Sequence, residues 1–140
     1  MITADLNKLE LTEFIAKGNP GQRCKATFPL LGAHGTKDSA TVYVELDPGE
    51  ELGTHTDSAE ELLLILEGTI EATVGAETTT ASKNQLIVVP KMEPHNFRNV
   101  GEGRAKVLGF FGGANHIVAT FDQTWWQTGS NQVDTAAMPG

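Results

Sequence analysis

Alternation of apolar and polar residues along the chain predicts a protein built of short β-strands. Between residues 41 and 46, Val42, Val44 and Leu46 alternate with polar or amphipathic neighbours, as a strand with one buried face requires. Similar short runs recur between turn signals such as Asp47-Pro48-Gly49. Regular spacing of this kind favours an all-β sandwich or barrel. The predicted strands are residues 24–30, 41–46, 61–67, 69–74, 78–81, 85–89, 95–99, 105–111 and 116–121.

Three segments depart from this pattern. Residues 62–66 are continuously apolar, so we expect a strand covered on both faces, by the interior on one side and by the amino-terminal segment or a partner subunit on the other. Residues 6–17 place apolar side chains at roughly helical spacing and end at a Gly-Asn-Pro-Gly turn, which predicts a short helix or an irregular arm. Residues 128–140 are small and polar and predict a loosely held tail.

Composition narrows the class of protein. A chain of 140 residues with 39% hydrophobic residues is expected to form one domain, whose core needs neither disulfides nor a structural metal. The net charge of −8 disfavours nucleic acid and anionic membranes as partners. The single cysteine, Cys24, cannot form an internal disulfide, and the first residues lack the pattern of an export signal. We therefore expect a cytoplasmic protein without a membrane-spanning segment, in which any metal serves chemistry.

Candidate chemistry lies around two of the four histidines. His55 and Asp57 are two residues apart, so an extended segment would place both side chains on one face. Glu61 follows four residues later, and His95 comes from a separate predicted strand. Two imidazoles and one or two carboxylates that converge inside a barrel form a site for a divalent transition metal. The other histidines, His34 and His116, lack such neighbours and are interpreted as structural.

Other conspicuous residues are also interpreted as structural. Cys24 has no neighbouring base that would make it a nucleophile. Of the pair Trp125 and Trp126, one ring is expected to pack on the barrel with its N–H bonded to a carbonyl. The glycine-rich segment 109–113 lacks the Lys-Ser/Thr ending of a phosphate-binding loop and is interpreted as a bend after a strand.

The residues around His55 resemble the first motif of the cupin family. That motif reads Gly, five residues, His-any-His, three or four residues, Glu, six residues, Gly. Gly49, His55, Glu61 and Gly68 fall on its fixed positions, and Asp57 stands where the second His would be.

A second cupin motif reads Gly, five residues, Pro, any residue, Gly, two residues, His, three residues, Asn. Pro90, His95 and Asn99 match it, while Asn84 and Met92 replace the two glycines. Asparagine readily takes the left-handed conformation that glycine would supply, whereas Met92 is a clear departure.

The resemblance implies a cupin-type double-stranded β-helix, or jelly-roll barrel, with a short amino-terminal arm or helix. Its expected divisions are an arm over residues 1–22, the barrel over 23–124 and a tail over 125–140. The resemblance also implies a homodimer and a metal site with His55, Glu61 and His95 as ligands, and with Asp57 as a possible fourth ligand.

The carboxylate at position 57 leaves three alternatives open. If Asp57 ligates beside Glu61, the formal charge of a divalent site is 2 − 2 = 0, against +1 for three histidines and one glutamate, which weakens the ion as a Lewis acid. If Asp57 points away, two histidines and Glu61 remain, the ligand set of mononuclear non-haem iron oxygenases, and Asp57 can act as general base. In the third alternative, the site has lost tight metal binding and serves only to bind a ligand.

The preferred function is an oxygen-using, dioxygenase-like oxidoreductase that acts on a small organic substrate, with Asp57 and Glu61 as candidate catalytic residues. Fe(II) is the favoured metal, although the same ligand types suit Zn, Ni and Mn. The first alternative is a redox-neutral, metal-dependent isomerase, epimerase or lyase, in which the ion polarises a carbonyl. The second is a non-catalytic binding protein for a metal or a small ligand, because a fold alone does not fix chemistry.

Overall fold

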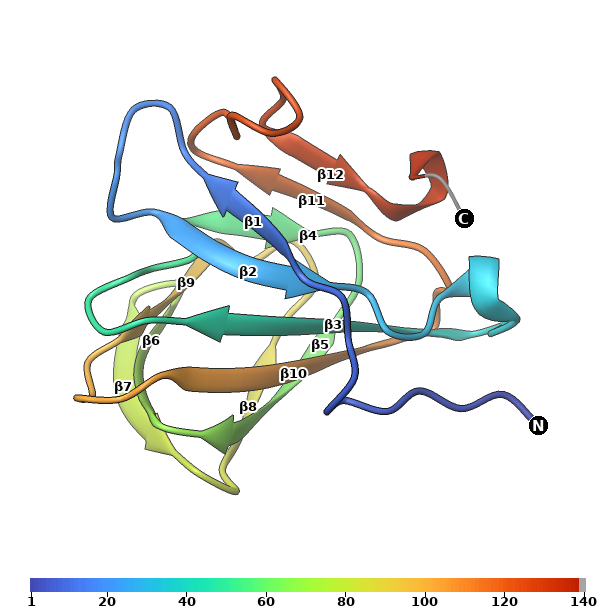
Figure 1. The fold of residues 1–140 in the computed structure, drawn as a ribbon, viewed down its shortest axis with the longest axis horizontal. Coiled ribbons are helices and arrows are strands. Elements are labelled where there is room, and N and C mark those ends of the chain that lie inside the picture. The colour runs from blue at the N-terminus through green and yellow to red at the C-terminus, as the bar shows by residue number, and fades with distance from the viewer. Residues whose placement is uncertain (139–140) are drawn as a thin grey trace.

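The computed structural model describes residues 1–138 and consists of two six-stranded antiparallel sheets that form a jelly-roll barrel (Figure 1). The strand orders are β1-β2-β3-β10-β5-β8 and β12-β11-β4-β9-β6-β7. The only helical segments in this part of the chain are two 3-10 turns, Gly32–His34 and Thr135–Ala137, and no helix in it is long and apolar enough to cross a membrane. The strands are β1 Thr12–Ile15, β2 Arg23–Thr27, β3 Ser39–Leu46, β4 His55–Asp57, β5 Glu61–Glu67, β6 Thr69–Val74, β7 Glu77–Ser82, β8 Leu86–Val89, β9 His95–Asn99, β10 Ala105–Gly112, β11 Val118–Phe121 and β12 Gln132–Asp134.

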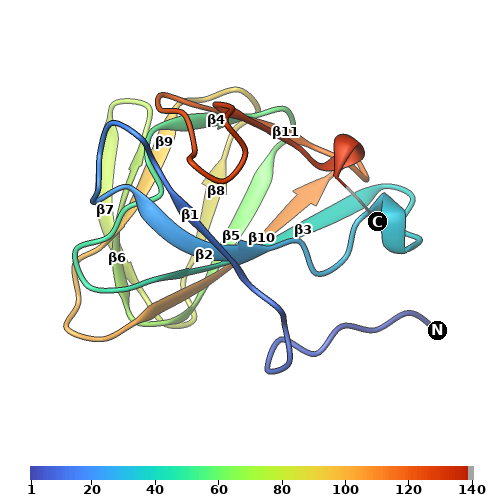
Figure 2. The same cartoon turned by 45° about the horizontal axis from the view of Figure 1, so that its top comes forward.

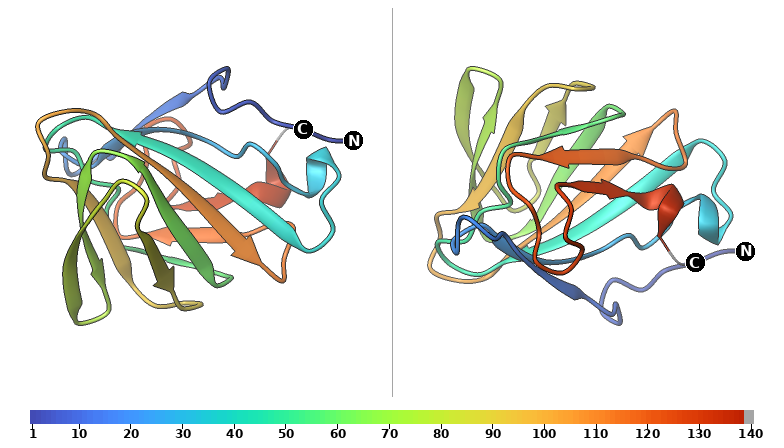
Figure 3. Two further views of the ribbon diagram at one scale, coloured as in Figure 1. Left: turned by 90° about the horizontal axis from the view of Figure 1, so that it is seen from below. Right: turned by 90° about the horizontal axis from the view of Figure 1, so that it is seen from above.

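The two sheets face each other in the views from below and above (Figure 3), and two clusters of buried apolar side chains form the core between them. Val44 and Leu46 of β3 point into it, which confirms the alternation predicted for this strand. Ile70 and Phe97 of the opposite sheet are buried in the same cluster. All nine predicted strands are present within a few residues of their expected bounds, because their apolar positions face this common interior.

The amino-terminal segment, predicted as a short helix or an irregular arm, contains a strand. Residues Thr12–Ile15 form β1, which pairs antiparallel with β2 so that Phe14 lies opposite Cys24 (Figure 2). The preceding residues have no regular secondary structure beyond a turn. The few apolar residues at helical spacing do not outweigh the hydrogen bonds that the open edge of β2 offers. The sheet therefore begins before residue 23.

The carboxyl-terminal segment is also part of the fold, so the prediction of a loose tail is wrong for most of its length. Gln132–Asp134 form β12, which pairs with β11. Thr135 is buried, and its hydroxyl oxygen accepts a hydrogen bond of 2.9 Å from the backbone N–H of Ile117. Residues 139 and 140 of the predicted tail lie outside the described residues.

The apolar run on β5 is buried on one face only within a single chain. Leu63 and Ile65 are buried in the core, whereas Leu62 is 44% exposed on the outer face. Its neighbours across the sheet, Val88 on β8 and Phe110 on β10, are exposed as well. The amino-terminal segment therefore does not cover this part of the sheet, and cover by a partner subunit stays a prediction.

The turn at Met92 carries backbone strain that glycine would relieve. Asn84 and Met92, which replace the glycines of the second motif, have φ angles of 71° and 62°. We expect Met92→Gly to stabilise the fold by about 0.5–1 kcal/mol, because a side chain in this region costs more than the entropy that glycine adds, and Met92 is 54% exposed. Urea denaturation measures the change. Asn84→Gly is the matched control and should have a smaller effect, and equal effects of the two variants would contradict this account.

Candidate metal centre

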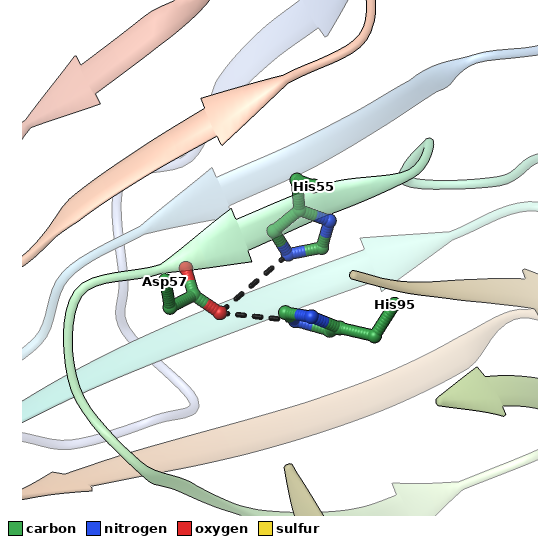
Figure 4. A group of neighbouring side chains, drawn as sticks. All are labelled: His55, Asp57 and His95. Atoms are coloured by element: carbon green, nitrogen blue, oxygen red, sulfur yellow. Dashed lines mark ion pairs between the residues drawn. The ribbon is translucent and has the colours of Figure 1, made fainter. Parts of the chain in front are cut away.

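Four buried polar side chains from three strands meet inside the barrel. His55 and Asp57 come from β4, Glu61 begins β5, and His95 begins β9. The pairing of β4 with β9 places His55 directly opposite His95, so their ring centroids are 4.0 Å apart. Figure 4 shows His55, Asp57 and His95 pointing toward one another.

Both histidine rings are oriented by hydrogen bonds to backbone carbonyl groups that lie just before their strands. The Nδ1 atom of His55 is 2.8 Å from the carbonyl oxygen of Gly53, and Nδ1 of His95 is 2.8 Å from that of Glu93. Each ring therefore carries its proton on Nδ1 as donor and leaves the Nε2 lone pair for a metal. Burial lowers the pKa of His55 to about 4, so this ring is neutral at pH 7. Phe121 stacks on it at 4.5 Å between centroids.

The carboxylates approach the same two nitrogen atoms. Asp57 Oδ2 lies 3.0 Å from His95 Nε2 and 3.7 Å from His55 Nε2, and Glu61 Oε1 lies 3.9 Å from His95 Nε2. Within residues 1–138, Asp57 Oδ2, Glu61 Oε1 and His95 Nε2 are buried without a hydrogen-bond partner. Burial, and after it the charge of Asp57, raises the pKa of Glu61 well above its ordinary value.

This arrangement fits a metal ion. Two donors bonded to one ion at about 2.1 Å each lie no more than about 4.2 Å apart, and the three distances above meet that limit. Buried polar atoms without partners are rare in proteins, and a cation bound by Asp57 and His95 would satisfy two of the three at once. Glu61 lies beside this cluster and not within it, because its carboxylate is not within 4.8 Å of all the other ligand atoms. The His55, Asp57 and His95 cluster can therefore hold a metal ion.

Comparison of the sequence with known protein families identifies the family of this chain. A family model described as a cupin domain matches residues 42–111, which is half of the chain and includes all four site residues. The chain belongs to the cupin family. No curated protein sequence matches it.

Solved structures with the same fold share little sequence with this cupin. A structure titled a putative sugar phosphate isomerase from Acidithiobacillus ferrooxidans is 18% identical, with a TM-score of 0.67 and coverage of 100% of this chain and 95% of that one. A variant of oxalate decarboxylase from Bacillus subtilis is 19% identical, with a TM-score of 0.71. The match covers 84% of this chain and 31% of that one, so the present chain spans about a third of the decarboxylase. The polyketide cyclase RemF from Streptomyces resistomycificus is 17% identical, with a TM-score of 0.65 and coverage of 80% of this chain and 79% of that one. At such identities these similarities support the fold alone.

The two remaining histidines of this cupin have structural partners, in line with their interpretation from the sequence. Nδ1 of His34 accepts a hydrogen bond of 3.0 Å from the backbone N–H of Leu31. Nδ1 of His116 lies 3.0 Å from the hydroxyl oxygen of Thr135.

Gly109 is part of the site and was not singled out from the sequence. It lies inside β10, since that strand continues to Gly112, and the interpretation of residues 109–113 as a bend is therefore wrong. A Cβ atom at Gly109 would overlap Oε2 of Glu61 and lie 2.8 Å from Val42 Cγ1. The missing side chain thus makes room for the Glu61 carboxylate. A glycine within an otherwise apolar strand was the available signal.

A cavity of about 70 Å³ adjoins the candidate metal site of this cupin, and its walls are mostly aliphatic and aromatic side chains. Five of the six phenylalanines line it, together with Trp125, whose indole N–H finds no acceptor among the described residues, contrary to expectation. The thiol of Cys24 also faces it, and burial raises its pKa to about 12, so this cysteine is a poor nucleophile.

Proposed function

We propose that this cupin holds one divalent transition metal through His55, Asp57 and His95, with Glu61 beside them, and uses it to oxidise a small organic substrate with molecular oxygen. The observation that carries the proposal is the convergence of three buried, unpartnered polar atoms beside an apolar cavity. Two imidazoles with carboxylate oxygens form a ligand set that suits Fe(II). Zn, Ni and Mn remain possible occupants for the same reason.

The chain's own residues would perform three tasks in this reaction, beside the chemistry that the ion supplies. The two Nδ1 hydrogen bonds fix the imidazole rings. The aromatic walls exclude water from the substrate. A bound Fe(II) supplies one-electron chemistry, which amino-acid side chains lack. Of Asp57 and Glu61, the carboxylate that is less engaged in ligation can accept a substrate proton, and Glu61 is the better candidate because it lies outside the His55, Asp57 and His95 cluster.

A redox-neutral reaction is the main alternative. The names of the three similar structures specify an isomerase, a decarboxylase and a cyclase, so the shared fold does not select one chemistry. In such an enzyme the ion would polarise a carbonyl, and the same residues would hold it. A metal-binding or ligand-binding protein without catalysis is the second alternative.

Metal analysis followed by oxygen uptake tests the proposal. Protein purified without added metal or chelator is expected to contain close to one transition-metal ion per chain. The Fe(II)-loaded protein is then supplied with phenolic and dicarbonyl compounds in an oxygen electrode. Oxygen uptake that requires both substrate and metal supports the oxidoreductase, whereas turnover without uptake favours the isomerase or lyase. Metal-free protein that also fails to bind added Fe, Zn, Ni or Mn would overturn the metal site itself.

We also propose that the protein forms a homodimer through the exposed outer face of β5, β8 and β10. Leu62, Val88 and Phe110 lie side by side there, and an exposed apolar sheet face is typical of an interface. Val88→Lys is expected to convert the dimer to a monomer in light scattering coupled to gel filtration, because it places a charge within this face. Thr79→Lys, on an exposed position of β7, is the matched control. Wild-type protein that elutes as a monomer would contradict this prediction.

A further inference from the structure

We infer that the ligand of the barrel is a small neutral molecule with an apolar body and one polar group that faces the metal centre. This inference rests on the proposed metal site and adds to it the class of substrate. It follows from three features of the cavity: the chemistry of its walls, the charge of its polar end and its size.

The walls offer no cationic side chain that could pair with an anion. Among the described residues that line the cavity, the only ionisable groups are those of His55, Asp57, Glu61 and the Cys24 thiol, and none is a lysine, arginine, serine or threonine. The basic residues of β2 alternate with the cavity-lining ones and point outward, where Arg23 pairs with Glu13 at 3.0 Å. A carboxylate or phosphate in this cavity would lose its hydration without gaining a charged partner.

The polar end of the cavity adds no net attraction for an anion. Two carboxylates, Asp57 and Glu61, border it, and with a divalent ion the formal charge is 2 − 2 = 0 when both are ionised. A neutral carbonyl or hydroxyl oxygen can still bind such an ion through its lone pair. The apolar remainder of the molecule would contact aromatic and aliphatic walls.

The size of the cavity limits the ligand to a few heavy atoms. One water needs roughly 10–15 Å³ and an engineered cavity that binds benzene measures about 150 Å³, so about 70 Å³ lies between the two. A ketone of about four heavy atoms is therefore a better probe than an aromatic ring of about six. Larger ligands would require the walls to move.

Two probes of nearly equal shape test the charge requirement. Acetone and acetate share one skeleton, and a methyl group in the ketone takes the place of the charged oxygen in the acid. Binding is measured by NMR titration of the indole N–H signal of Trp125, which lines the cavity; Trp126→Phe assigns that signal because Trp126 is exposed. We expect the ketone to bind the Zn(II)-loaded protein at least about tenfold more tightly than acetate. Equal or tighter binding of acetate would overturn the inference.

A cavity variant and a metal-free sample separate the possible failures. Val133→Lys places a cation on a half-buried wall residue and should strengthen acetate binding, while Ala26→Leu should fill the cavity and weaken binding of the ketone. Thr27→Leu, at the next position of the same strand, is the control for Ala26→Leu. The preference for the ketone should persist in protein stripped with EDTA. Protein that takes up no Zn(II) but keeps this preference would refute the proposed function alone, and loss of the preference in both samples would refute the inference.

Discussion

Replacing His95 with alanine is expected to weaken metal binding by at least about 100-fold, since loss of an outer partner of a ligand already costs 10- to 100-fold. His95 Nε2 is the atom that lies within 4 Å of both carboxylates, so its removal leaves Asp57 and Glu61 facing each other without a nitrogen ligand between them. Elemental analysis after dialysis gives the metal content. Thermal unfolding with added Zn(II) gives a second readout, because a ligand at a hundredfold excess over its Kd stabilises the folded state by about 2.7 kcal/mol.

The matched control for this variant is His116→Ala. His116 is a histidine of the same barrel whose ring contacts Thr135 and not the carboxylates, so its loss should leave metal content unchanged. Equal metal loss in both variants would mean that the histidines act only through the fold. Asp57→Asn and Glu61→Gln then show how much each carboxylate contributes to metal binding. We expect the larger loss of metal for Asp57→Asn, because Asp57 approaches both imidazoles.

Replacing Trp125 with alanine is expected to destabilise the protein by about 3–5 kcal/mol. This ring is 1% exposed and joins the amino-terminal strand to the rest of the barrel, with Phe14 at 5.8 Å and Phe121 at 5.0 Å between centroids. Phe121 in turn stacks on His55, so removal of the Trp125 ring is also expected to disturb the position of His55 in the candidate metal site. Urea denaturation monitored by circular dichroism measures the change in the free energy of unfolding.

The neighbouring residue provides the control. Trp126 is 61% exposed, and its main contact is the ammonium group of Lys17 at 4.8 Å from the ring. Trp126→Ala is expected to cost less than about 1 kcal/mol, the value of an exposed cation–π contact. Similar losses in the two variants would show that the segment after β11 is not anchored by Trp125.

The sequence predicted the central strands because their burial pattern is periodic and bounded by turns. It did not predict β1, β4 and β12, which have four, three and three residues. Such short strands show no readable alternation. β1 and β12 form because β2 and β11 leave an edge to pair with, and β4 forms because it lies between β11 and β9. The helical spacing of residues 6–17 was therefore a misleading signal.

The four site residues could be named from motif spacing, but their mutual distances could not. Spacing places His55 and Asp57 on one face of a strand, yet the approach of Asp57 to His95 depends on the pairing of β4 with β9. The space that Glu61 occupies depends on Gly109, which is 48 residues away along the chain and lies on the neighbouring strand. Both are tertiary relations that no local pattern encodes.

The two carbonyl groups that orient the imidazoles belong to Gly53 and Glu93, each two residues before its histidine in the segment that leads into the strand. Neither hydrogen bond involves the ion, so both rings keep their direction when a chelator strips the protein. Reloading then needs no rearrangement of the backbone, and one preparation could be emptied and refilled with different ions in turn, which makes a side-by-side comparison of Fe, Zn, Ni and Mn forms practical.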